Sequence, residues 1–498
     1  MSTTHLTILA KGGWSQVIRR IKPLCTHIRG SAPHGTKVYL TFNPSLHSQL
    51  NNKSVAGWGN VCSSIYSQLG TKQDIYIRFL DQDQGNAKAI DIETLTEDDI
   101  KTDKEPTSTD RLYTNVCLGG TFDRLHAGHK ILLTTALLRC TGCLTVGVTS
   151  PSLLGRKTLC ELIEPLEKRI SVVKEFIQTV NRNISHNVVE ITDPFGPAIV
   201  DPDIECIVGS TETEKGCLAI NEKRKEKELK PLDIHIIDLV QDDNREEVHE
   251  EEKISSSSAR TRVLGLGEAA CTNPQASLQG RRLRSSLQPW DRSKGPYIIG
   301  LTGGSASGKS SVGRRLKDMG AGLVDCDKLG HSAYLPGSTA LKKIVEEFGD
   351  QVLAEDGTIN RRVLGGIVFS DRSKLEVLNQ IVWPEIARMA LEQAKQDWEA
   401  GHEVVVLDAA VLLEAGWNSY CHEIWVCLIP RDEAVSRIVL RDGKTAEEAE
   451  KRVDSQWSNQ ERCKVAHTVF CTLWDQEVTQ RQVELAWNRL REELELSS

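Results

Sequence analysis

The sequence lacks an excess of basic residues and lacks long apolar runs, and each absence excludes a class of protein. The formal net charge is −8 at pH 7, whereas proteins that bind nucleic acid usually carry a basic domain or stripe. No apolar run approaches the roughly 18–20 residues that span a bilayer. We therefore expect a water-soluble protein without a nucleic-acid partner. Its 498 residues predict about three domains at roughly 150 residues each.

The 14 cysteines lack the short, regular spacing of a disulfide framework, and no secretory signal is recognisable. We expect reduced thiols in an intracellular protein. Cys140 and Cys143 have CxxC spacing, but they have no second pair and no nearby histidines. This favours a structural or incidental role over a zinc site.

The first region of the chain also lacks acidic residues, because no Asp or Glu precedes Asp74. Such a basic start resembles a mitochondrial targeting segment or a membrane-surface segment. Residues 14–28 place apolar side chains at helical spacing, at Trp14, Val17, Ile18, Ile21 and Leu24. This pattern suits an amphipathic helix on a mitochondrial membrane surface. An ordinary basic helix packed on its own domain is the open alternative, so the expected location is cytoplasmic, mitochondrial or both.

Changes in composition divide the chain into four regions. Residues 1–110 are poorly diagnostic and end in an acidic stretch typical of a solvated linker. Residues 111–265 and 295–498 each alternate apolar strands with helical patterns, and residues 266–294 form a linker rich in Gly, Ser, Gln and Arg. Strands alternating with helices at this spacing predict parallel sheets with crossover helices. The expected fold class is α/β, with two doubly wound parallel-sheet domains in series after a less certain N-terminal region.

A complete phosphate-binding loop, GxxxxGK[ST], opens the second of these domains. An apolar strand at 297–302 precedes the loop and a helical run at 311–319 follows, so backbone N–H groups can wrap a phosphate at a helix N-terminus. Lys309 would reach the β- and γ-phosphates, and the Ser310 hydroxyl would bind Mg²⁺. The expected ATP-binding residues are Gly303, Gly304, Ser305, Ala306, Ser307, Gly308, Lys309, Ser310 and Ser311.

The next strand ends in Asp325-Cys326-Asp327, at the sheet edge where α/β proteins bind ligands. A carboxylate there can accept the proton of an acceptor hydroxyl or hold the metal. The runs VDCDKLGHSAYLPG, LNQIVWPEI and VVLDAAVLLEAGW resemble dephospho-CoA kinase, and the resemblance covers residues 295–495. It implies Asp327 as general base, Asp325 at the metal, and Arg441 as a lid arginine that stabilises charge on the transferred phosphoryl group. Which of the two carboxylates is the base stays open.

Three positions depart from that family. Its usual His-Pro is Trp383-Pro384 here, and its Ala-Asp before the last strand is Ala466-His467. The asparagine that the family has after that strand is replaced near Cys471. These departures concern adenine or acceptor binding rather than phosphoryl transfer.

The first α/β domain opens on a strand at 115–119 that runs into GTFDRLHAGH and then into an apolar helix. His126 and His129 are three residues apart at a helix start, so they face the same way and can donate hydrogen bonds to nucleotide phosphates. Gly128 lets the nucleotide approach closely. A second helix start carries KISSSSAR, which ends at Arg260 and combines hydroxyls with a cation. HxGH domains resemble both nucleotidyltransferases and class I aminoacyl-tRNA synthetases, and the second element helps to decide between them.

KISSSSAR resembles the ISSS/T…R element of phosphopantetheine adenylyltransferases, and it is neither KMSKS nor RTxGIST. The resemblance implies a pantetheine-phosphate site at Thr121 and Lys157, with Arg156 and Lys168 as alternatives to Lys157. The arginine that bacterial relatives place after the fourth strand is absent, because Gly209-Ser210-Thr211 stands there. The ATP site implied by the resemblance consists of Gly119, Thr121, Phe122, His126, Gly128, His129, Ser255, Ser256, Ser257 and Arg260.

An HxGH adenylyltransferase followed by a dephospho-CoA-kinase-like domain resembles the order in animal CoA synthases. This resemblance implies transfer of AMP from ATP to 4′-phosphopantetheine, giving dephospho-CoA and pyrophosphate. ATP-dependent phosphorylation of the ribose 3′-hydroxyl, with Mg²⁺, would follow. The implied catalytic residues are His126, His129, Lys309, Asp327 and Arg441. Another fusion of a nucleotidyltransferase with a small-molecule kinase, or a membrane-associated scaffold with vestigial enzyme domains, are the alternatives.

Overall fold

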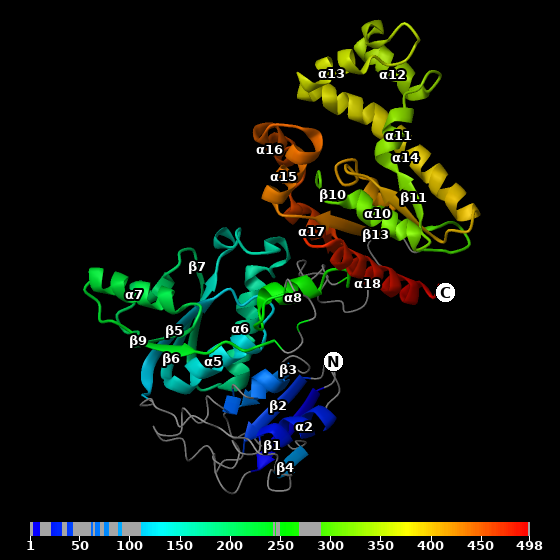
Figure 1. Cartoon of the computed structure of the whole chain (residues 1–498). Helices are drawn as coiled ribbons and strands as arrows, with labels where there is room; N and C mark the ends of the chain where they lie inside the picture. The colour runs from blue at the N-terminus through cyan, green and yellow to red at the C-terminus, as the bar shows by residue number, and fades with distance from the viewer. Residues whose placement is uncertain are drawn as a thin grey trace. The chain divides into compact units, whose positions relative to one another are not determined.

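The chain divides into two compact units, Met1–Thr261 (the N-terminal unit) and Arg262–Ser498 (the C-terminal unit) (Figure 1). The computed structural model describes residues 3–9, 21–31, 37–42, 61–62, 65–69, 74–78, 88–91, 111–242, 245, 250–267 and 290–496. Most of the predicted linker at 266–294 and of the acidic stretch at 91–105 therefore lies outside the described residues. Among the described residues, no helix is both long and apolar enough to cross a membrane.

The N-terminal unit begins with a parallel sheet that sequence reasoning did not predict. Its strands are β1 (Thr3–Leu9), β2 (Lys37–Phe42), β3 (Asp74–Arg78) and β4 (Lys88–Asp91), in the order β3-β2-β1-β4. Helix α2 (Ile21–Ser31) buries Leu24, Cys25 and Ile28 almost completely in the same core. The apolar face of this helix is thus packed inside the protein, which supports the ordinary-helix alternative and not the membrane-surface one. Residues 14–20 of the predicted amphipathic helix lie outside the described residues.

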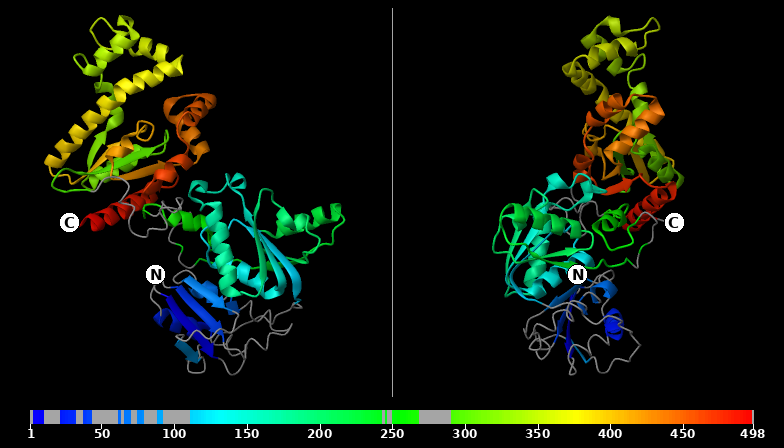
Figure 2. Two further views of the ribbon diagram at one scale, coloured as in Figure 1. Left: turned by 180° about the vertical axis from the view of Figure 1, so that it is seen from behind. Right: turned by 60° about the vertical axis from the view of Figure 1, so that its left-hand side comes forward.

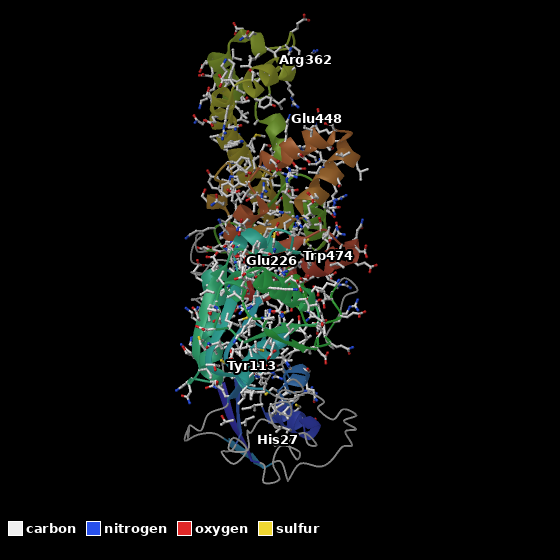
Figure 3. All side chains as sticks on the ribbon, turned by 90° about the vertical axis from the view of Figure 1, so that its left-hand side faces the viewer. His27, Tyr113, Glu226, Arg362, Glu448 and Trp474 are labelled. Carbon is white, nitrogen blue, oxygen red and sulfur yellow. The ribbon has the colours of Figure 1, made fainter. Side chains whose placement is uncertain are left out.

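The second sheet of the N-terminal unit is the predicted doubly wound one. Its strands are β5 (Tyr113–Gly120), β6 (Cys140–Thr149), β7 (Ser185–Ile191), β8 (Cys206–Ser210) and β9 (Asp233–Ile237), all parallel in the order β7-β6-β5-β8-β9. Tyr113, the first residue of β5, is labelled in Figure 3. Its helices are α5 (Ala127–Arg139), α6 (Leu166–Val180), α7 (Glu214–Glu226) and α8 (Ser256–Arg262). The strand order reverses at β5, and the carboxyl ends of strands at such a switch point are where doubly wound proteins bind ligands.

The two sheets of the N-terminal unit share one hydrophobic core. The Tyr76 ring of β3 lies 5.9 Å from the Phe176 ring of α6. The Lys130 ammonium of α5 donates to the Ile75 carbonyl of β3 at 3.1 Å and lies over the Tyr76 ring. Both sheets also order their first four strands in the same way, 3-2-1-4 along the chain. The first sheet is therefore a packed part of this unit.

The C-terminal unit holds the second predicted doubly wound sheet, with the parallel order β11-β12-β10-β13-β14. The strands are β10 (Tyr297–Gly303), β11 (Gly322–Asp325), β12 (Val404–Asp408), β13 (Glu423–Leu428) and β14 (Thr468–Cys471). Every residue of β10, β12, β13 and β14 is buried, as expected for strands that helices cover on both faces. The confirmed fold class is α/β with doubly wound parallel sheets.

Two groups of helices in the C-terminal unit lie outside the layers that cover its sheet. Helix α14 (Arg372–Glu399) contacts the sheet through β11 and β12, while α12 (Thr339–Phe348) and α13 (Arg361–Phe369) pack on α14 (Figure 2). A second group, α15 (Arg431–Asp442), α16 (Ala446–Asp454) and α17 (Asn459–Val465), follows β13. Glu448, labelled in Figure 3, completes the capping box that begins α16. The remaining helices are α10 (Lys309–Asp318), α11 (Cys326–Ser332) and α18 (Gln476–Leu494).

Candidate active sites

The first candidate site lies at the carboxyl end of β5, where the GTFD loop leads into α5. Phe122 and Arg124 adopt left-handed backbone conformations, with φ of 51° and 48°, and so turn the chain sharply between strand and helix. Gly128 leaves room at the start of α5, because a Cβ there would make a tight contact of 3.2 Å with the His126 ring. The glycine therefore lets the His126 ring fold over the first turn of the helix.

The His126 and His129 rings stack with their centroids 3.8 Å apart, and Phe122 packs on His129 at 5.2 Å. Burial lowers the pKa of His126 to about 4, and burial together with His126 and Lys157 lowers the pKa of His129 well below its usual range. The Nδ1 atom of each ring is buried without a hydrogen-bond partner in the described part of the chain. Buried polar atoms are seldom left without partners, so these two point to a ligand that completes them.

Arg260 lies in the interior, away from solvent, although the sequence placed it at the ATP phosphates. Its Nη1 donates to Asp123 Oδ2 at 2.5 Å and its Nε donates to the Thr158 carbonyl at 3.0 Å. The Asp123 side chain also accepts from the Glu164 amide at 2.9 Å. Both charged side chains are at most 1% exposed. Arg260 therefore holds the GTFD loop, α8 and the loop after β6 together.

The serines at the start of α8 also make contacts within the protein. Ser255 Oγ accepts from the Ser258 amide at 3.1 Å, and Ser256 Oγ donates to the Asp123 carbonyl at 2.8 Å. Ser257 Oγ accepts from the Arg260 guanidinium at 3.3 Å. These bonds fix the KISSSSAR segment against the GTFD loop and so bring the two predicted motifs into one site.

Arg169 on α6 is a site residue that sequence reasoning missed. Its guanidinium donates to the carbonyls of Thr121 and Thr149, at 2.8 and 2.9 Å, and the side chain is almost fully buried. It thereby ties together the chain ends that leave β5 and β6. In the sequence it is one of several charged residues in the helical pattern of 166–180, and nothing there distinguishes it from a surface arginine.

Lys157 lies in the loop after β6 with an exposed side chain, and its charge helps to lower the pKa of His129. Lys168, one of its alternatives, is paired with Glu164 at 2.7 Å. The other alternative, Arg156, is exposed. The geometry thus favours Lys157 as the cation that faces the histidine pair. Gly119, also assigned to this site, is exposed at the end of β5.

The second candidate site is the phosphate-binding loop between β10 and α10. Ala306 and Gly308 have φ of 62° and 79°, and the loop is fastened by Thr472, whose Oγ1 donates to the Ser307 carbonyl at 2.9 Å. A Cβ on Gly308 would lie 2.7 Å from Thr472 Oγ1, so only glycine fits. The chain from Gly303 to Ser311 therefore forms a fixed cradle at the start of α10, where Ser310 is exposed.

Lys309 reaches two carboxylates at the carboxyl edge of the sheet. Its ammonium donates to Asp327 Oδ2 at 3.1 Å and to Asp408 Oδ1. Burial opposes the charge on Lys309, but the two carboxylates outweigh burial and raise its pKa. Asp408 at the end of β12 was missed by sequence reasoning. Its signal was present, since VVVLD is an apolar strand that ends in a carboxylate, as in the strand that carries the metal-binding aspartate of P-loop enzymes.

Asp325 and Asp327 have different surroundings. Asp325 caps α11 by accepting from the Lys328 amide at 3.0 Å and pairs with the Lys328 ammonium at 2.9 Å. Asp327 accepts from the Ala410 amide at 3.2 Å and faces Lys309. Of the two, Asp327 is therefore the one that lies at the phosphate-binding loop.

The helices after β13 bring a different arginine to the loop from the one that the sequence suggested. Arg441 is bonded to Asp442 at 2.7 Å. Arg452 bonds the same Asp442 and also donates to Ser305 Oγ at 3.2 Å. Gln456 Oε1 accepts from the Ser305 amide at 2.8 Å. Arg437 on α15 also donates to the Ala306 carbonyl at 3.4 Å, so Arg437, Arg452 and Gln456 all contact the phosphate-binding loop.

Two of the three sequence departures lie in well-defined surroundings. His467 Nδ1 accepts from the Ile424 amide at 3.0 Å, so this ring satisfies a backbone donor near the start of β13. Cys471 is fully buried and its amide donates to Gln482 Oε1 at 2.9 Å. In the described chain, no group of three or more His, Cys, Asp or Glu side chains could hold a metal ion, so Cys140 and Cys143 form no such group.

Comparison with known proteins connects each site to a family. Residues 297–472 match the family model described as dephospho-CoA kinase, and residues 117–262 match the model described as cytidylyltransferase-like. A dephospho-CoA kinase from Carboxydothermus hydrogenoformans is 39% identical over 186 residues, which cover 37% of this chain and 90% of that protein. One from Geobacter sulfurreducens is 38% identical over 190 residues, covering 38% of this chain and 96% of the relative. A solved dephospho-CoA kinase from Campylobacter jejuni aligns with a TM-score of 0.32 and 23% identity, over 40% of this chain and 98% of that chain.

Proposed function

The chain belongs to the dephospho-CoA kinase family and is a bifunctional enzyme of coenzyme A biosynthesis, and we propose that its N-terminal unit makes the substrate of its C-terminal unit. In this proposal, residues 111–265 transfer AMP from ATP to 4′-phosphopantetheine, and residues 295–498 phosphorylate the product. The observation that supports it is the pair of stacked histidines with unpartnered Nδ1 atoms at the end of β5. Such a site suits phosphate oxygens, and dephospho-CoA is a product of adenylyl transfer.

In the first reaction, a phosphate oxygen of 4′-phosphopantetheine attacks the α-phosphorus of ATP, and the bond to pyrophosphate breaks. No protein nucleophile is needed, so catalysis rests on positioning and on stabilising charge. His126 and His129 are neutral at pH 7, because burial lowers their pKa values, and each can donate one N–H to a phosphate oxygen. Lys157 supplies a cation for the acceptor phosphate. Asp123, Arg260 and Arg169 hold the loops that carry these groups.

In the second reaction, the ribose 3′-hydroxyl of dephospho-CoA attacks the γ-phosphorus of a second ATP, and ADP leaves. Asp327 accepts the hydroxyl proton, and Lys309 neutralises charge on the β- and γ-phosphates. We assign stabilisation of charge on the transferred phosphoryl group to Arg452 as well as Arg441, because Arg452 already contacts Ser305. The Ser310 hydroxyl and the Asp408 carboxylate are hard oxygen donors of the kind that Mg²⁺ prefers. Bound there, the ion would neutralise phosphate charge, and Asp325 is left as the cap of α11.

Acceptor specificity tests the proposal. Purified protein is supplied with ATP and 4′-phosphopantetheine, and pyrophosphate release is measured. Parallel reactions replace the acceptor by nicotinamide mononucleotide, or replace ATP by CTP. We expect pyrophosphate only with ATP and 4′-phosphopantetheine. Release with another pair would favour a different nucleotidyltransferase fused to the kinase, and no release with any pair, from protein that still phosphorylates dephospho-CoA, would indicate a vestigial N-terminal site.

A further inference from the structure

Lys253 lies beside the HxGH motif although it is remote from it in sequence. The chain before α8 runs antiparallel to the segment that follows β9, with Lys253 in a bridge opposite Gln241 and the Ile254 amide donating to the Val240 carbonyl at 2.9 Å. The Ile254 carbonyl lies 3.9 Å from the position of a Cβ on Gly128. The backbone of Lys253 is thus fixed next to the first turn of α5.

The side chain of Lys253 extends toward the carboxyl end of β8. Its ammonium pairs with Glu212, in the loop after β8, and with Glu251 at 3.1 Å. The side chain is 23% exposed, so the ammonium is partly withdrawn from water yet still accessible. Because β8 is the neighbour of β5, this cation lies at the switch point where doubly wound sheets bind ligands.

Several groups that favour an anion face this point. Burial and the charge of Lys157 both lower the pKa of Lys253. The pKa of His126 is lowered by burial first and then by Lys130 and Lys253, against the opposing charge of Asp242. Lys157 makes no ion pair with any residue that the structure describes. Cations that are brought close together repel unless an anion is shared between them. Lys157 lies in the loop after β6, and the Lys253 ammonium pairs with Glu212 in the loop after β8. The strands β6 and β8 flank β5, and the histidines with unpartnered Nδ1 atoms follow β5.

We propose that Lys253 binds a substrate phosphate in the transferase site, with Glu212 as its partner when no phosphate is present. This inference rests on the proposed adenylyl transfer. In this role Lys253 supplies a cation at the sheet edge where the sequence has Gly209-Ser210-Thr211 and no arginine. On binding, a phosphate oxygen replaces Glu212 as the acceptor of the Lys253 N–H groups. The phosphate belongs either to the acceptor or to ATP, and the two KM values distinguish these sources.

The experiment compares three variants of the full chain, Lys253→Met, Lys253→Arg and Glu212→Gln, with Lys227→Met as a control for loss of an exposed lysine. Lys253→Met and Glu212→Gln break the same ion pair, but only Lys253→Met removes the phosphate ligand. We expect Lys253→Met to raise the KM for one substrate about 10- to 100-fold, which is the usual value of a hydrogen bond to a charged group. Lys253→Arg should restore most of the loss, and Glu212→Gln should not raise either KM.

Two outcomes would overturn the inference. Unchanged KM values in Lys253→Met would show that Lys253 does not contact substrate. Equal losses in Lys253→Met and Glu212→Gln would show that the ion pair acts only by holding the fold. The kinase rate with added dephospho-CoA, measured on the same samples, reports that each variant is folded. If the wild-type protein itself makes no dephospho-CoA, the proposed function has failed rather than the role of Lys253.

Discussion

The guanidinium of Arg260 and the carboxylate of Asp123 form an ion pair that is almost completely withdrawn from solvent. The two residues are 137 positions apart and belong to the two motifs of the transferase site. Each also bonds the backbone around it, at Thr158 and Glu164. The pair therefore fixes the geometry between the motifs, and its charges are unavailable to substrate in this structure.

Arg260→Met tests that structural role. Removing one partner leaves the Asp123 charge buried and unpaired, which typically costs about 3–5 kcal/mol. We expect the transferase region to lose this much stability while the kinase region is unchanged. Hydrogen exchange of residues 111–242, measured in urea, would report the loss. Adding Asp123→Asn should recover part of the loss, since it removes the unpaired charge. A stable Arg260→Met protein with only a raised KM for ATP would instead support direct phosphate contact.

Asp408→Asn tests the carboxylate that the sequence analysis missed. The change keeps the shape but removes the charge next to Lys309, so we expect the kinase kcat to fall about 10²- to 10³-fold, as for loss of other aligned electrostatic contacts. Dephospho-CoA should then accumulate. Asp325→Asn is the matched control, and it should leave kcat nearly unchanged, because asparagine caps a helix about as well as aspartate. If Asp325→Asn stopped the kinase and Asp408→Asn did not, the two roles would be exchanged.

Lys130→Met tests whether the first sheet supports the transferase site. The change removes the ammonium that donates to the Ile75 carbonyl. A buried group left without its partner costs about 1–3 kcal/mol. We expect the N-terminal unit to unfold at lower urea and adenylyl transfer to be more heat-sensitive. Lys227→Met, which changes an exposed lysine, should have no such effect. Equal stability of the two variants would show that the Lys130 contact contributes nothing.

The buried histidines predict a dependence of stability on pH. His126 has a pKa of about 4 in the folded chain, against a usual value of about 6.5 in an unfolded one. Between these values the unfolded state binds the extra proton, so stability is full above about pH 6.5 and falls as the pH is lowered toward 4. His126→Gln should lessen this fall, by an amount on the order of 1–3 kcal/mol at pH 4.5. Parallel curves for the two proteins, from urea unfolding at each pH, would contradict a buried neutral His126.

Sequence reasoning succeeded where a motif and its flanking elements agree locally. β5 and β10 each run as apolar strands into a glycine-containing turn and a helix, and that order predicted both doubly wound sheets. It failed for the first sheet, because its strands are separated by long segments without clear periodicity. Its helix α2 was read in part as a membrane-surface helix, since an apolar stripe has the same spacing whether it faces lipid or a sheet.

The candidate sites show the same division. The sequence identified Lys309 and Asp327, and the structure brings them together at 3.1 Å. It could not show that Asp408 joins them, because the three residues are adjacent only through the strand order of the sheet. It likewise could not distinguish an arginine that contacts phosphate from one that is buried in an ion pair. That distinction depends on long-range packing, as for Arg260 and Asp123.

The most direct test of two separate sites in one chain follows products by mass spectrometry in the wild-type protein and in two variants, His129→Ala and Lys309→Ala. With 4′-phosphopantetheine, ATP and Mg²⁺, the wild-type protein should form dephospho-CoA and then CoA. Lys309→Ala should stop at dephospho-CoA, and His129→Ala should form neither product but still convert added dephospho-CoA to CoA. Loss of both activities in either folded variant would contradict two independent sites and would require a single shared one.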